Sequence, residues 1–452
     1  MVLRVIETFS GIGAQAKALS RIKDEISDFD YEIVATCEWE IGAMYAYDLI
    51  HHGKQNLEQY KNYSKDELFQ QLKKYNISSD GKEPITESAL KRMTIDQMKA
   101  ILHSIERNKN LVDIQNVHAQ DLPDADLLTY SFPCQDLSIS SFWWNNTSGI
   151  DPEANNRSSL LWEIGRILKE YKEINKPLPK FLLMENVTQI ESPMHVDNFK
   201  KWQSLLHDIG YEINKVFQLN ARDFGIPQNR VRTYMLSVLN NSYNEKIFNM
   251  LEKVDYNYGF FQPENYPKLD NFLRLDYSNP TYLEEAIESI PNYTPSRISI
   301  HNNAVILAEG QQVNDVIAKT ITTKQDRNPT AGVIIHQLPL QNKSLAPYRN
   351  LTPRETFLLM GFDEDDFQFV KDQNIQISKN RKFISHAKFL KLAGNSIVVN
   401  VLEEIFKTVN EIDKTYFSDN KNIRKRPITR CIASLQSSSY TVFKQKIGED
   451  FL

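Results

Sequence analysis

Cysteine is scarce in this chain: the 452 residues contain three, at Cys37, Cys134 and Cys431. They show no paired spacing and no neighbouring Cys/His cluster, so the sequence argues against a disulfide framework and against a structural metal site. The chain also lacks an apolar run long enough to span a bilayer, and no signal-peptide pattern precedes the first predicted strand. We therefore expect a cytoplasmic protein that binds no metal.

An excess of basic residues is also absent. The chain has 53 Lys and Arg against 58 Asp and Glu, a formal net charge of −5, so total charge alone gives no indication of a nucleic-acid partner. Local basic clusters do occur. Arg222, Arg230 and Arg232 lie close together in the sequence, whereas residues 379–391 and 424–426 are better interpreted as solvated basic faces.

The length exceeds that of one typical hydrophobic core, which predicts two domains. Through the first half of the chain, short apolar runs typical of strands alternate with segments of helical periodicity. The predicted strands are residues 3–8, 31–37, 125–130, 180–187, 212–219 and 232–238, and the predicted helices are residues 14–26, 41 onward, 159–171 and 198–209. This alternation predicts an α/β fold with a parallel sheet covered on both faces, whose ligands bind outside the carboxyl ends of the strands.

Three of the predicted strands end in residues that can carry chemistry. The first runs into the turn Phe9-Ser10-Gly11-Ile12-Gly13, whose glycines permit a sharp turn and the close approach of a ligand. The strand at 125–130 is followed by Cys134, and the strand at 180–187 ends on Glu185 and Asn186. A lone cysteine is often only a small buried side chain, but this one shares a sheet edge with an acid and a glycine turn.

A series of short motifs follows the order found in the DNA (cytosine-5)-methyltransferases of bacteria and phages, and the chain resembles that family. The motifs are Phe9-Ser10-Gly11-Ile12-Gly13, Glu38-Trp39, Asp113-Ile114, Pro133-Cys134-Gln135, Glu185-Asn186-Val187, Gln228-Asn229-Arg230-Val231-Arg232, Arg349-Asn350-Leu351-Thr352-Pro353-Arg354-Glu355 and Gly394-Asn395-Ser396. Each motif alone is weak, whereas the ordered set is specific. It covers the chain from its N-terminus to about Phe406, apart from one insertion and a variable region.

The resemblance implies a doubly wound, mostly parallel, Rossmann-like sheet with a smaller and irregular target recognition domain. Residues 1–239 and 345–410 would form the catalytic domain, and residues 240–344 the recognition domain. Residues 411–452 would be a C-terminal extension, of which the part from Lys414 has no family counterpart that we recognise.

Residues 51–110 are more numerous than compact members of the family need at this place. Helical periodicity in residues 65–75 and 95–105 predicts a helical insertion packed on the edge of the sheet. We interpret it as a surface decoration.

The resemblance implies S-adenosylmethionine as the cofactor, bound at the glycine turn. Glu38, at the end of the second strand, would accept hydrogen bonds from both ribose hydroxyls, and Trp39 either stacks on the adenine ring or is a core aromatic. Asp113 would accept from the adenine amino group. The full predicted set is Phe9, Ser10, Gly11, Ile12, Gly13, Glu38, Trp39, Asp113, Ile114, Pro133, and, from the final motif that closes the pocket, Asn395 and Ser396.

The resemblance also implies the reaction, methyl transfer to carbon 5 of a cytosine within a specific duplex DNA sequence. That carbon is a poor nucleophile, so Cys134 would first add to carbon 6. Glu185 would act as a general acid at N3 if a closed site raises its pKa, and Asn186 would hold the turn that aims it. Arg232, with Arg230 as a second candidate, would neutralise the cytosine carbonyl or a phosphate and lower the pKa of the thiol.

The target cytosine must be flipped out of the duplex, at a cost of about a few kcal/mol. Residues 138–157 correspond to the family's mobile catalytic loop, but here the sequence Ser140-Ser141-Phe142-Trp143-Trp144 replaces the glycines and basic residue that are common there. Either tryptophan would wedge into the base stack, or both pack the loop against its own domain. The predicted DNA-contacting residues are Gln135, Ser138, Trp143, Trp144, Arg157, Thr322 and Thr323.

Three alternatives remain open from the sequence. One is an RNA cytosine methyltransferase, although its Cys-Phe-Thr signature is absent; another is a catalytically inactive DNA-binding relative, although the thiol and the acid are both present. The third is a nicotinamide-dependent oxidoreductase, but the turn lacks the third glycine of the dinucleotide fingerprint. We expect a monomer that acts on double-stranded DNA at the nucleoid, in a restriction-modification or phage-protection system with a possible cognate restriction endonuclease as a separate protein.

Overall fold

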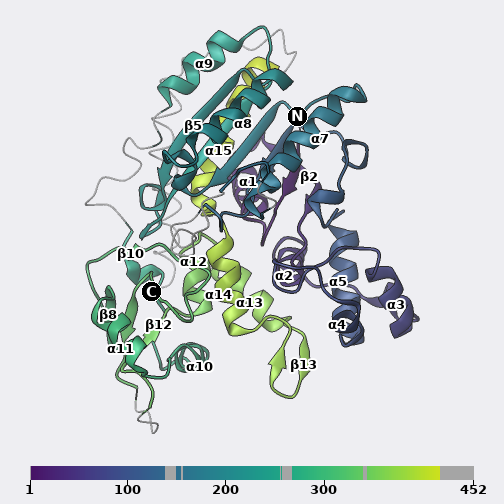
Figure 1. The fold of residues 1–452 in the computed structure, drawn as a ribbon. Coiled ribbons are helices and arrows are strands. Elements are labelled where there is room, and N and C mark those ends of the chain that lie inside the picture. The colour runs from purple at the N-terminus through teal and green to yellow at the C-terminus, as the bar shows by residue number, and fades with distance from the viewer. Residues whose placement is uncertain are drawn as a thin grey trace.

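The computed structural model describes residues 2–137, 149–153, 156–254, 256, 267–338 and 344–417. Its centre is a six-stranded sheet in the order β2-β1-β3-β4-β7-β5 (Figure 1). The strands are β1 (Val2–Thr8), β2 (Asp30–Cys37), β3 (Leu127–Tyr130), β4 (Phe181–Asn186), β5 (Ile213–Asn220) and β7 (Val231–Val238). β1 to β4 pair in parallel, and β7 is antiparallel to both β4 and β5. The predicted α/β fold with a mostly parallel sheet is therefore confirmed, and β7 is the one reversed strand.

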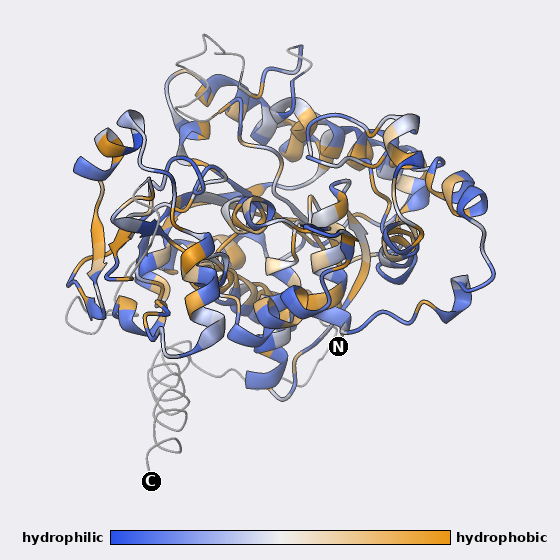
Figure 2. Cartoon of the chain, turned by 90° about the horizontal axis from the view of Figure 1, so that it is seen from below, coloured by the Kyte–Doolittle hydropathy of each residue, from blue (hydrophilic) through white to orange (hydrophobic). Residues whose placement is uncertain are grey.

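Both faces of this sheet are covered, as β4 illustrates. Phe181 and Leu183 belong to one buried cluster, with side chains of α1 (Ala14–Glu25) and α15 (Val399–Ile412). Leu182 and Met184 belong to the other, with side chains of α7 (Leu161–Glu173) and α8 (Val196–Ile209). Successive side chains of a strand point to opposite faces, so a strand buried on both sides is apolar throughout. Figure 2 shows hydrophobic colour concentrated toward the middle of the molecule and hydrophilic colour along most of its outline.

Segments near the two ends of the described chain pack together. α15 lies against α1, and the Arg21 guanidinium of α1 reaches Glu403 of α15 at 2.8 Å and the Gly361 carbonyl at 2.6 Å. Earlier in the chain than α15, α12 (Pro353–Leu358) begins at a capping box formed by Thr352 and Glu355. Glu355 also forms a fully buried ion pair with Arg349, at 2.7 Å.

The inserted residues form helices whose buried side chains share a hydrophobic core with α2. η1 (Glu58–Tyr60), α3 (Lys65–Leu72), α4 (Glu87–Lys91) and α5 (Ile95–Arg107) follow α2 (Ile41–His52). Their buried side chains, such as Leu68 and Leu102, share a cluster with Ile41 and Met44 of α2, and Trp39 packs on it. The interpretation as a surface decoration is therefore wrong, because the cluster continues into the sheet's own helix and reaches a predicted site residue.

Two elements of the second half of the chain lie at the predicted limits of the recognition region. α9 (Asn244–Lys253) lies against β5 of the central sheet, with an ion pair of 2.5 Å between Lys215 and Glu252. A four-stranded sheet follows, with β8 (Ile306–Glu309), β9 (Gln312–Val313), β11 (Val333–Ile335) and β12 (Tyr348–Asn350) in the order β12-β11-β8-β9. Because β12 pairs with β11, the boundary predicted at residue 345 cuts this sheet.

The other elements surround these sheets. They are α10 (Pro280–Glu288), α11 (Pro295–Asn302), α13 (Glu364–Asp372), α14 (His386–Asn395), the hairpin of β13 (Gln376–Ser378) and β14 (Arg381–Lys382), and the parallel pair of β6 (Gln228–Asn229) and β10 (Ala318–Lys319). Among the described residues, no helix combines the length and apolar character that a membrane span requires. Cys431, the basic run at 424–426 and the predicted extension beyond Phe417 lie outside the described residues.

Candidate active site

The loop after β3 holds Cys134 at the carboxyl end of the sheet. The Ser158 hydroxyl donates to the Pro133 carbonyl at 2.6 Å, and the Asn186 amide donates to the Phe132 carbonyl at 3.0 Å. Asn186 also accepts from the N–H of Val187 at 2.8 Å, so one side chain fixes both the turn after β4 and the cysteine loop. The side chains of Cys134 and Pro133 are half-buried.

Glu185 and Arg232 lie beside this cysteine on neighbouring strands. Arg232 Nε is 3.5 Å from Glu185 Oε1, and the two side chains are 16% and 12% exposed. Burial raises the pKa of the Glu185 carboxyl, although the charges of Arg232 and Arg230 oppose the rise. A carboxyl group with a raised pKa is suited to donate a proton near neutral pH.

The Cys134 thiol also has a raised pKa. Burial is the largest cause, and the positive charge of Arg232 opposes it. Arg232 thus favours the thiolate in the predicted direction, but burial outweighs it. The resting side chain is therefore protonated, and its proton must leave before it can act as a nucleophile.

Arg230 and Arg232 differ in their surroundings despite their proximity in the sequence. The buried Arg230 guanidinium donates to the carbonyls of Ile321 at 2.8 Å, Gly394 at 3.2 Å and Ser396 at 2.8 Å. It thereby joins the start of β7 to residues 319–323, here called the threonine segment, and to the end of α14. Arg232 is left as the arginine that faces Glu185.

The glycine turn after β1 takes a backbone path that few residues adopt. Phe9, Gly11 and Gly13 have φ angles of 56°, 56° and 80°, and the N–H of Phe9 donates to the Cys37 carbonyl at 2.7 Å. Positive φ at a non-glycine residue such as Phe9 is uncommon and occurs at functional sites. The imidazole of His51, from α2, donates through Nε2 to the Ile12 carbonyl at 3.1 Å. Ser10, Ile12 and Gly13 are buried.

Glu38 lies next to this turn at the end of β2. Its Oε2 accepts from the N–H of Gly11 at 3.0 Å and its Oε1 from the N–H of Glu40 at 2.8 Å. Burial raises the pKa of this carboxyl to about 7. Asn110 clamps the same residue through both backbone groups, accepting from the Glu38 N–H at 3.0 Å and donating to its carbonyl at 2.9 Å.

Asp113 follows Val112, a β-branched residue at a φ of 67°. The Asp113 carboxylate accepts from the N–H of Gln115 at 3.1 Å and from the side-chain amide of Asn76 at 2.6 Å. Ile114 is buried in the core of the α7 and α8 face. Trp39 is half-buried on the insertion's core, so it serves at least as a packing residue.

The last motif reaches the site through the threonine segment. A Cβ atom on Gly394 would lie 2.5 Å from the Thr322 carbonyl carbon and 2.6 Å from the Thr323 nitrogen, so only glycine permits this contact. Ser396 is buried and Asn395 is exposed. Thr322 and Thr323 are half-buried, and β10 pairs the segment before them with β6.

The predicted DNA-contacting residues are described only in part. Gln135 and Arg157 are half-buried near the cysteine loop, where Arg157 immediately precedes Ser158. Ser138, Trp143 and Trp144 lie outside the described residues. Arg222 pairs with its neighbour Asp223 at 3.3 Å, and of the basic run at 379–391, Lys388 is bound to Glu40 at 2.6 Å. The interpretation of that run as a solvated face is therefore wrong at Lys388.

Several residues that build the site carried no signal in the sequence. The side chains of Asn110, His51 and Ser158 donate hydrogen bonds to the backbone carbonyls of three predicted residues. These carbonyls belong to Glu38, Ile12 and Pro133, respectively. Polar side chains that bind a distant carbonyl have no characteristic spacing, because their partners are brought close only by folding. Of these three residues, only Asn110 lies next to a motif, three positions before Asp113, and this position could have indicated a role in the site.

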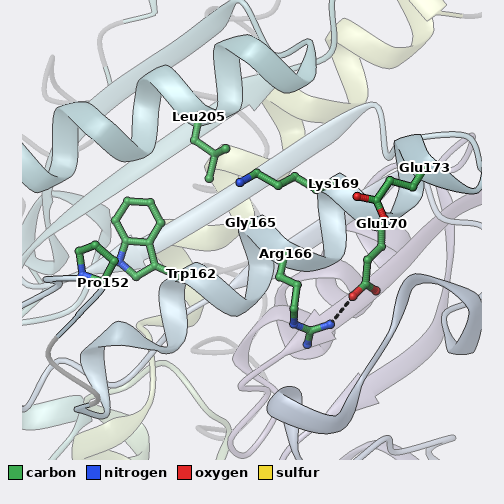
Figure 3. Close-up of a pocket in the computed structure, with 8 residues that line it drawn as sticks. All are labelled: Pro152, Trp162, Gly165, Arg166, Lys169, Glu170, Glu173 and Leu205. Atoms are coloured by element: carbon green, nitrogen blue, oxygen red, sulfur yellow. Dashed lines mark hydrogen bonds and ion pairs between the residues drawn. The ribbon is translucent and has the colours of Figure 1, made fainter.

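A pocket beside α7 is lined by other residues, although Arg166 on its wall donates to the Ile114 carbonyl at 3.3 Å. It lies between α7 and α8, and Pro152, Trp162, Arg166, Lys169 and Leu205 are among its lining residues (Figure 3). Arg166 forms an ion pair with Glu170 there, at 2.6 Å. The pocket contains none of the predicted site residues.

Comparison with known proteins identifies the family. The model of the family "C-5 cytosine-specific DNA methylase" matches residues 63–411. The chain belongs to this family. Among curated relatives, the orphan methyltransferase M.SssI of Spiroplasma monobiae is 31% identical over 90% of this chain and 97% of its own length. The type II methyltransferase M2.ScrFI of Lactococcus lactis subsp. cremoris is 32% identical over 90% of this chain and 98% of its own.

Solved structures agree with the C-5 cytosine methylase fold. The chain superposes on the S. pombe Dnmt2 methyltransferase with a TM-score of 0.53 and 19% identity, covering 91% of this chain and 99% of that one. The Entamoeba histolytica methyltransferase EhMeth gives a TM-score of 0.52 at 17% identity, over 91% of this chain and 98% of that one. The protein is thus a bacterial-type DNA (cytosine-5)-methyltransferase, which sets aside the oxidoreductase alternative.

Proposed function

We propose that this DNA methyltransferase transfers a methyl group from S-adenosylmethionine to carbon 5 of a cytosine flipped out of a specific duplex sequence, through a covalent Cys134 adduct. The observation that carries the proposal is the meeting of Cys134, Glu185 and Arg232 at the carboxyl end of the sheet, with Arg232 3.5 Å from Glu185. A thiol, a proton donor and a fixed positive charge are the groups that this chemistry requires.

The residues around the glycine turn fit the proposed cofactor. A Cβ atom on Gly11 would meet no atom within 4 Å, so the turn faces open space beside Glu38. The Glu38 carboxyl accepts backbone hydrogen bonds from Gly11, Glu40 and Trp39, which leaves one of its four lone pairs for a ribose hydroxyl. Asp113 offers an acceptor for the adenine amino group. S-adenosylmethionine supplies, when bound, the electrophilic methyl group that carbon 5 receives.

The protein's own groups carry the remaining steps. Cys134 loses its proton to solvent and its sulfur bonds to carbon 6, while the electron pair of the 5,6 double bond shifts toward carbon 5 and N3. Glu185 gives its proton to N3, and Arg232 neutralises the charge on the carbonyl side. After carbon 5 has been methylated, a base, proposed to be water, removes its proton. The sulfur–carbon bond then breaks, the electron pair returns to Cys134, and Glu185 recovers its proton.

The DNA contacts are assigned to the loop and the threonine segment. The residues proposed to contact DNA are Gln135, Ser138, Arg157, Thr322, Thr323 and one of Trp143 and Trp144. Arg230 holds the threonine segment in place through its hydrogen bond to the Ile321 carbonyl. Asn395 and Ser396 are proposed to close the cofactor pocket. A role in DNA protection, alone or with a separate endonuclease, is supported by the names of the relatives, one an orphan and one a type II methyltransferase.

The test is incubation of duplex DNA with tritiated S-adenosylmethionine and either the parent protein or Cys134→Ala, followed by nucleoside analysis. We expect label in 5-methylcytosine with the parent only. Label transferred by Cys134→Ala would rule out the covalent mechanism. If neither protein labels DNA, transfer RNA replaces the duplex, and label there would support an RNA substrate.

A further inference from the structure

The inserted residues contribute a side chain to the proposed cofactor site. Between α3 and α4, the side-chain amide of Asn76 donates to Asp113 Oδ2 at 2.6 Å. Asp113 is 8% exposed and Asn76 is half-buried, so this hydrogen bond is largely shielded from water. A short hydrogen bond to a charged oxygen in such surroundings is among the stronger polar contacts in proteins.

The segment that carries Asn76 is held firmly on both sides. The N–H of Ser78 donates to the Trp39 carbonyl at 2.7 Å, and the Ser78 carbonyl accepts from the N–H of Ile41 at 2.9 Å. Ile77, 1% exposed, is buried in the core that the insertion shares with α2. The segment therefore runs as an added strand-like edge along the turn that contains Trp39.

A second set of contacts ties the segment to the C-terminal part of the chain. Lys388 of α14 donates to the Ser79 carbonyl at 2.6 Å and pairs with Glu40 at 2.6 Å, and Lys391 donates to the Asp80 carbonyl. The insertion thus bridges the second strand's end and the helix of the last motif. Its position relative to Asp113 is set by contacts on three elements.

Counting acceptor positions on Asp113 indicates what these contacts leave for a ligand. Oδ2 receives two amide donors, Asn76 at 2.6 Å and Asn116 at 3.1 Å, which use both of its lone pairs. Oδ1 receives one, the N–H of Gln115 at 3.1 Å. One acceptor position therefore remains, on Oδ1, and its direction is fixed because Oδ2 is held by Asn76 and Asn116, of which Asn76 makes the shorter contact.

From this arrangement we infer that Asn76 is a positioning residue, which orients Asp113 so that Oδ1 accepts the adenine amino group of the cofactor. The inference rests on the proposed function, because it takes the ligand to be S-adenosylmethionine. It gives the insertion a role in cofactor selectivity. Without Asn76, Oδ2 keeps only the longer hydrogen bond from Asn116, at 3.1 Å, so the carboxylate is held less tightly and the hydrogen bond to the amino group loses its fixed geometry.

Calorimetric titration of the full-length protein tests this with two probes. One is S-adenosylhomocysteine, and the other is its analogue in which hydrogen replaces the adenine amino group. We expect the parent to prefer the first probe by about tenfold or more, since a hydrogen bond to a charged group is lost with the second. In Asn76→Ala the preference falls toward unity, while the affinity for the deamino analogue stays within about twofold of the parent's.

Two further variants sharpen the readout. Asn62→Ala removes an exposed asparagine of the same insertion and keeps the parental preference. Asn76→Asp keeps the shape but replaces the donor by a second carboxylate, and it loses the preference as well, which covers the case in which the alanine variant does not fold. Thermal unfolding of each variant establishes that it is folded.

The outcomes separate this inference from the proposed function. If the parent binds neither probe, the proposed cofactor is wrong. If the parent discriminates and Asn76→Ala retains the full preference, or loses equal affinity for both probes, the positioning role is wrong while the proposed cofactor stands.

Discussion

The Arg230 guanidinium donates to the Ser396 carbonyl at 2.8 Å, across 166 positions of the chain. The same group binds the Ile321 carbonyl at 2.8 Å. One buried arginine therefore fastens three segments, the start of β7, the threonine segment after β10 and the end of α14. Arg232, two residues on, faces the Glu185 carboxyl instead.

This contrast predicts that alanine substitutions of the two arginines affect different properties: Arg230→Ala mainly stability, and Arg232→Ala mainly the catalytic rate. Arg230→Ala removes the donor from the buried hydrogen bonds to the Ile321 and Ser396 carbonyls and from the partly buried one to Gly394. Each buried carbonyl left unpaired costs about 1 to 3 kcal/mol, so the free energy of unfolding falls by at least about 2 kcal/mol. Arg232→Ala lowers it less than Arg230→Ala does, because Arg232 loses one ion pair, and burial already favours the protonated, uncharged form of its partner Glu185, while kcat falls at least about tenfold. Urea unfolding and methyl-transfer assays on both variants measure this. Equal losses of stability would contradict it.

Replacing Glu185 by glutamine tests the proton donor. Glutamine keeps the size of the side chain but cannot supply a proton to N3, so we expect kcat to fall by roughly 10² to 10⁴. DNA affinity stays near that of the parent, because the side chain serves the reaction step. The matched control is Glu191→Gln, a nearby carboxylate that accepts from Thr233 and Gln218. Gel-shift assays measure the DNA affinity, and single-turnover assays measure the rate of methyl transfer. A parental rate in Glu185→Gln would show that Glu185 is not the proton donor.

The sequence predicted the parts of this molecule that depend on local pattern. Alternation of apolar runs and helical segments predicted the six strands within a few residues, since a strand buried on both faces must be apolar throughout. It could not reveal that β7 is antiparallel, because strand direction depends on the connection between elements and not on which residues are buried. The order of motifs predicted the family, which comparison confirmed.

What the sequence did not reveal depends on distant contacts. Nothing in residues 51–110 indicates that Asn76 reaches Asp113, 37 positions further on, or that Lys388 reaches Ser79. The two arginines of one motif look alike in sequence, and only the fold separates the buried tie from the one beside Glu185. Nor does the sequence show that α9, just inside the predicted start of the recognition region, lies against β5, or that β12, just past its predicted end, pairs with β11.

Alanine substitutions at Gly11 and Gly394 should impair two different properties, cofactor affinity and stability. Gly11 has a φ of 56° and no atom within 4 Å of its Cβ position, so Gly11→Ala costs only the strain of about 1 to 2 kcal/mol. Its methyl group, however, occupies the proposed cofactor space, and the Kd of S-adenosylhomocysteine rises at least about tenfold. In Gly394→Ala, a methyl group would lie 2.5 Å from the Thr322 carbonyl carbon, so α14 must shift and stability falls further.

Calorimetric titration and thermal unfolding of the two glycine variants measure this difference. The expected pattern is a stable Gly11→Ala that binds poorly and a Gly394→Ala that is the less stable of the two. Parental affinity in Gly11→Ala would place the cofactor elsewhere.

Glu7, fully buried on β1 beneath the glycine turn, predicts a pH-dependent stability. It accepts a hydrogen bond from Tyr47 at 2.7 Å, and burial raises the pKa of its carboxyl from 4.5 to about 7. Below pH 4.5 the folded and unfolded states both hold this proton, and the full contribution to stability is present. Between pH 4.5 and about 7, only the folded state holds this proton. Unfolding then releases it, so the free energy of unfolding falls as pH rises.

The gap between 4.5 and about 7 corresponds to about 3 kcal/mol at roughly 1.4 kcal/mol per pH unit. Glu7→Gln cannot ionise, yet its carbonyl oxygen can still accept from Tyr47. Its stability relative to the parent should therefore increase by about 3 kcal/mol between pH 4.5 and 8. Urea unfolding across this range measures the difference. Glu38, whose carboxyl also has a pKa of about 7, adds a loss of the same sign in both proteins, so it cancels in the comparison. A difference that does not change with pH would mean that folding does not raise the pKa of Glu7.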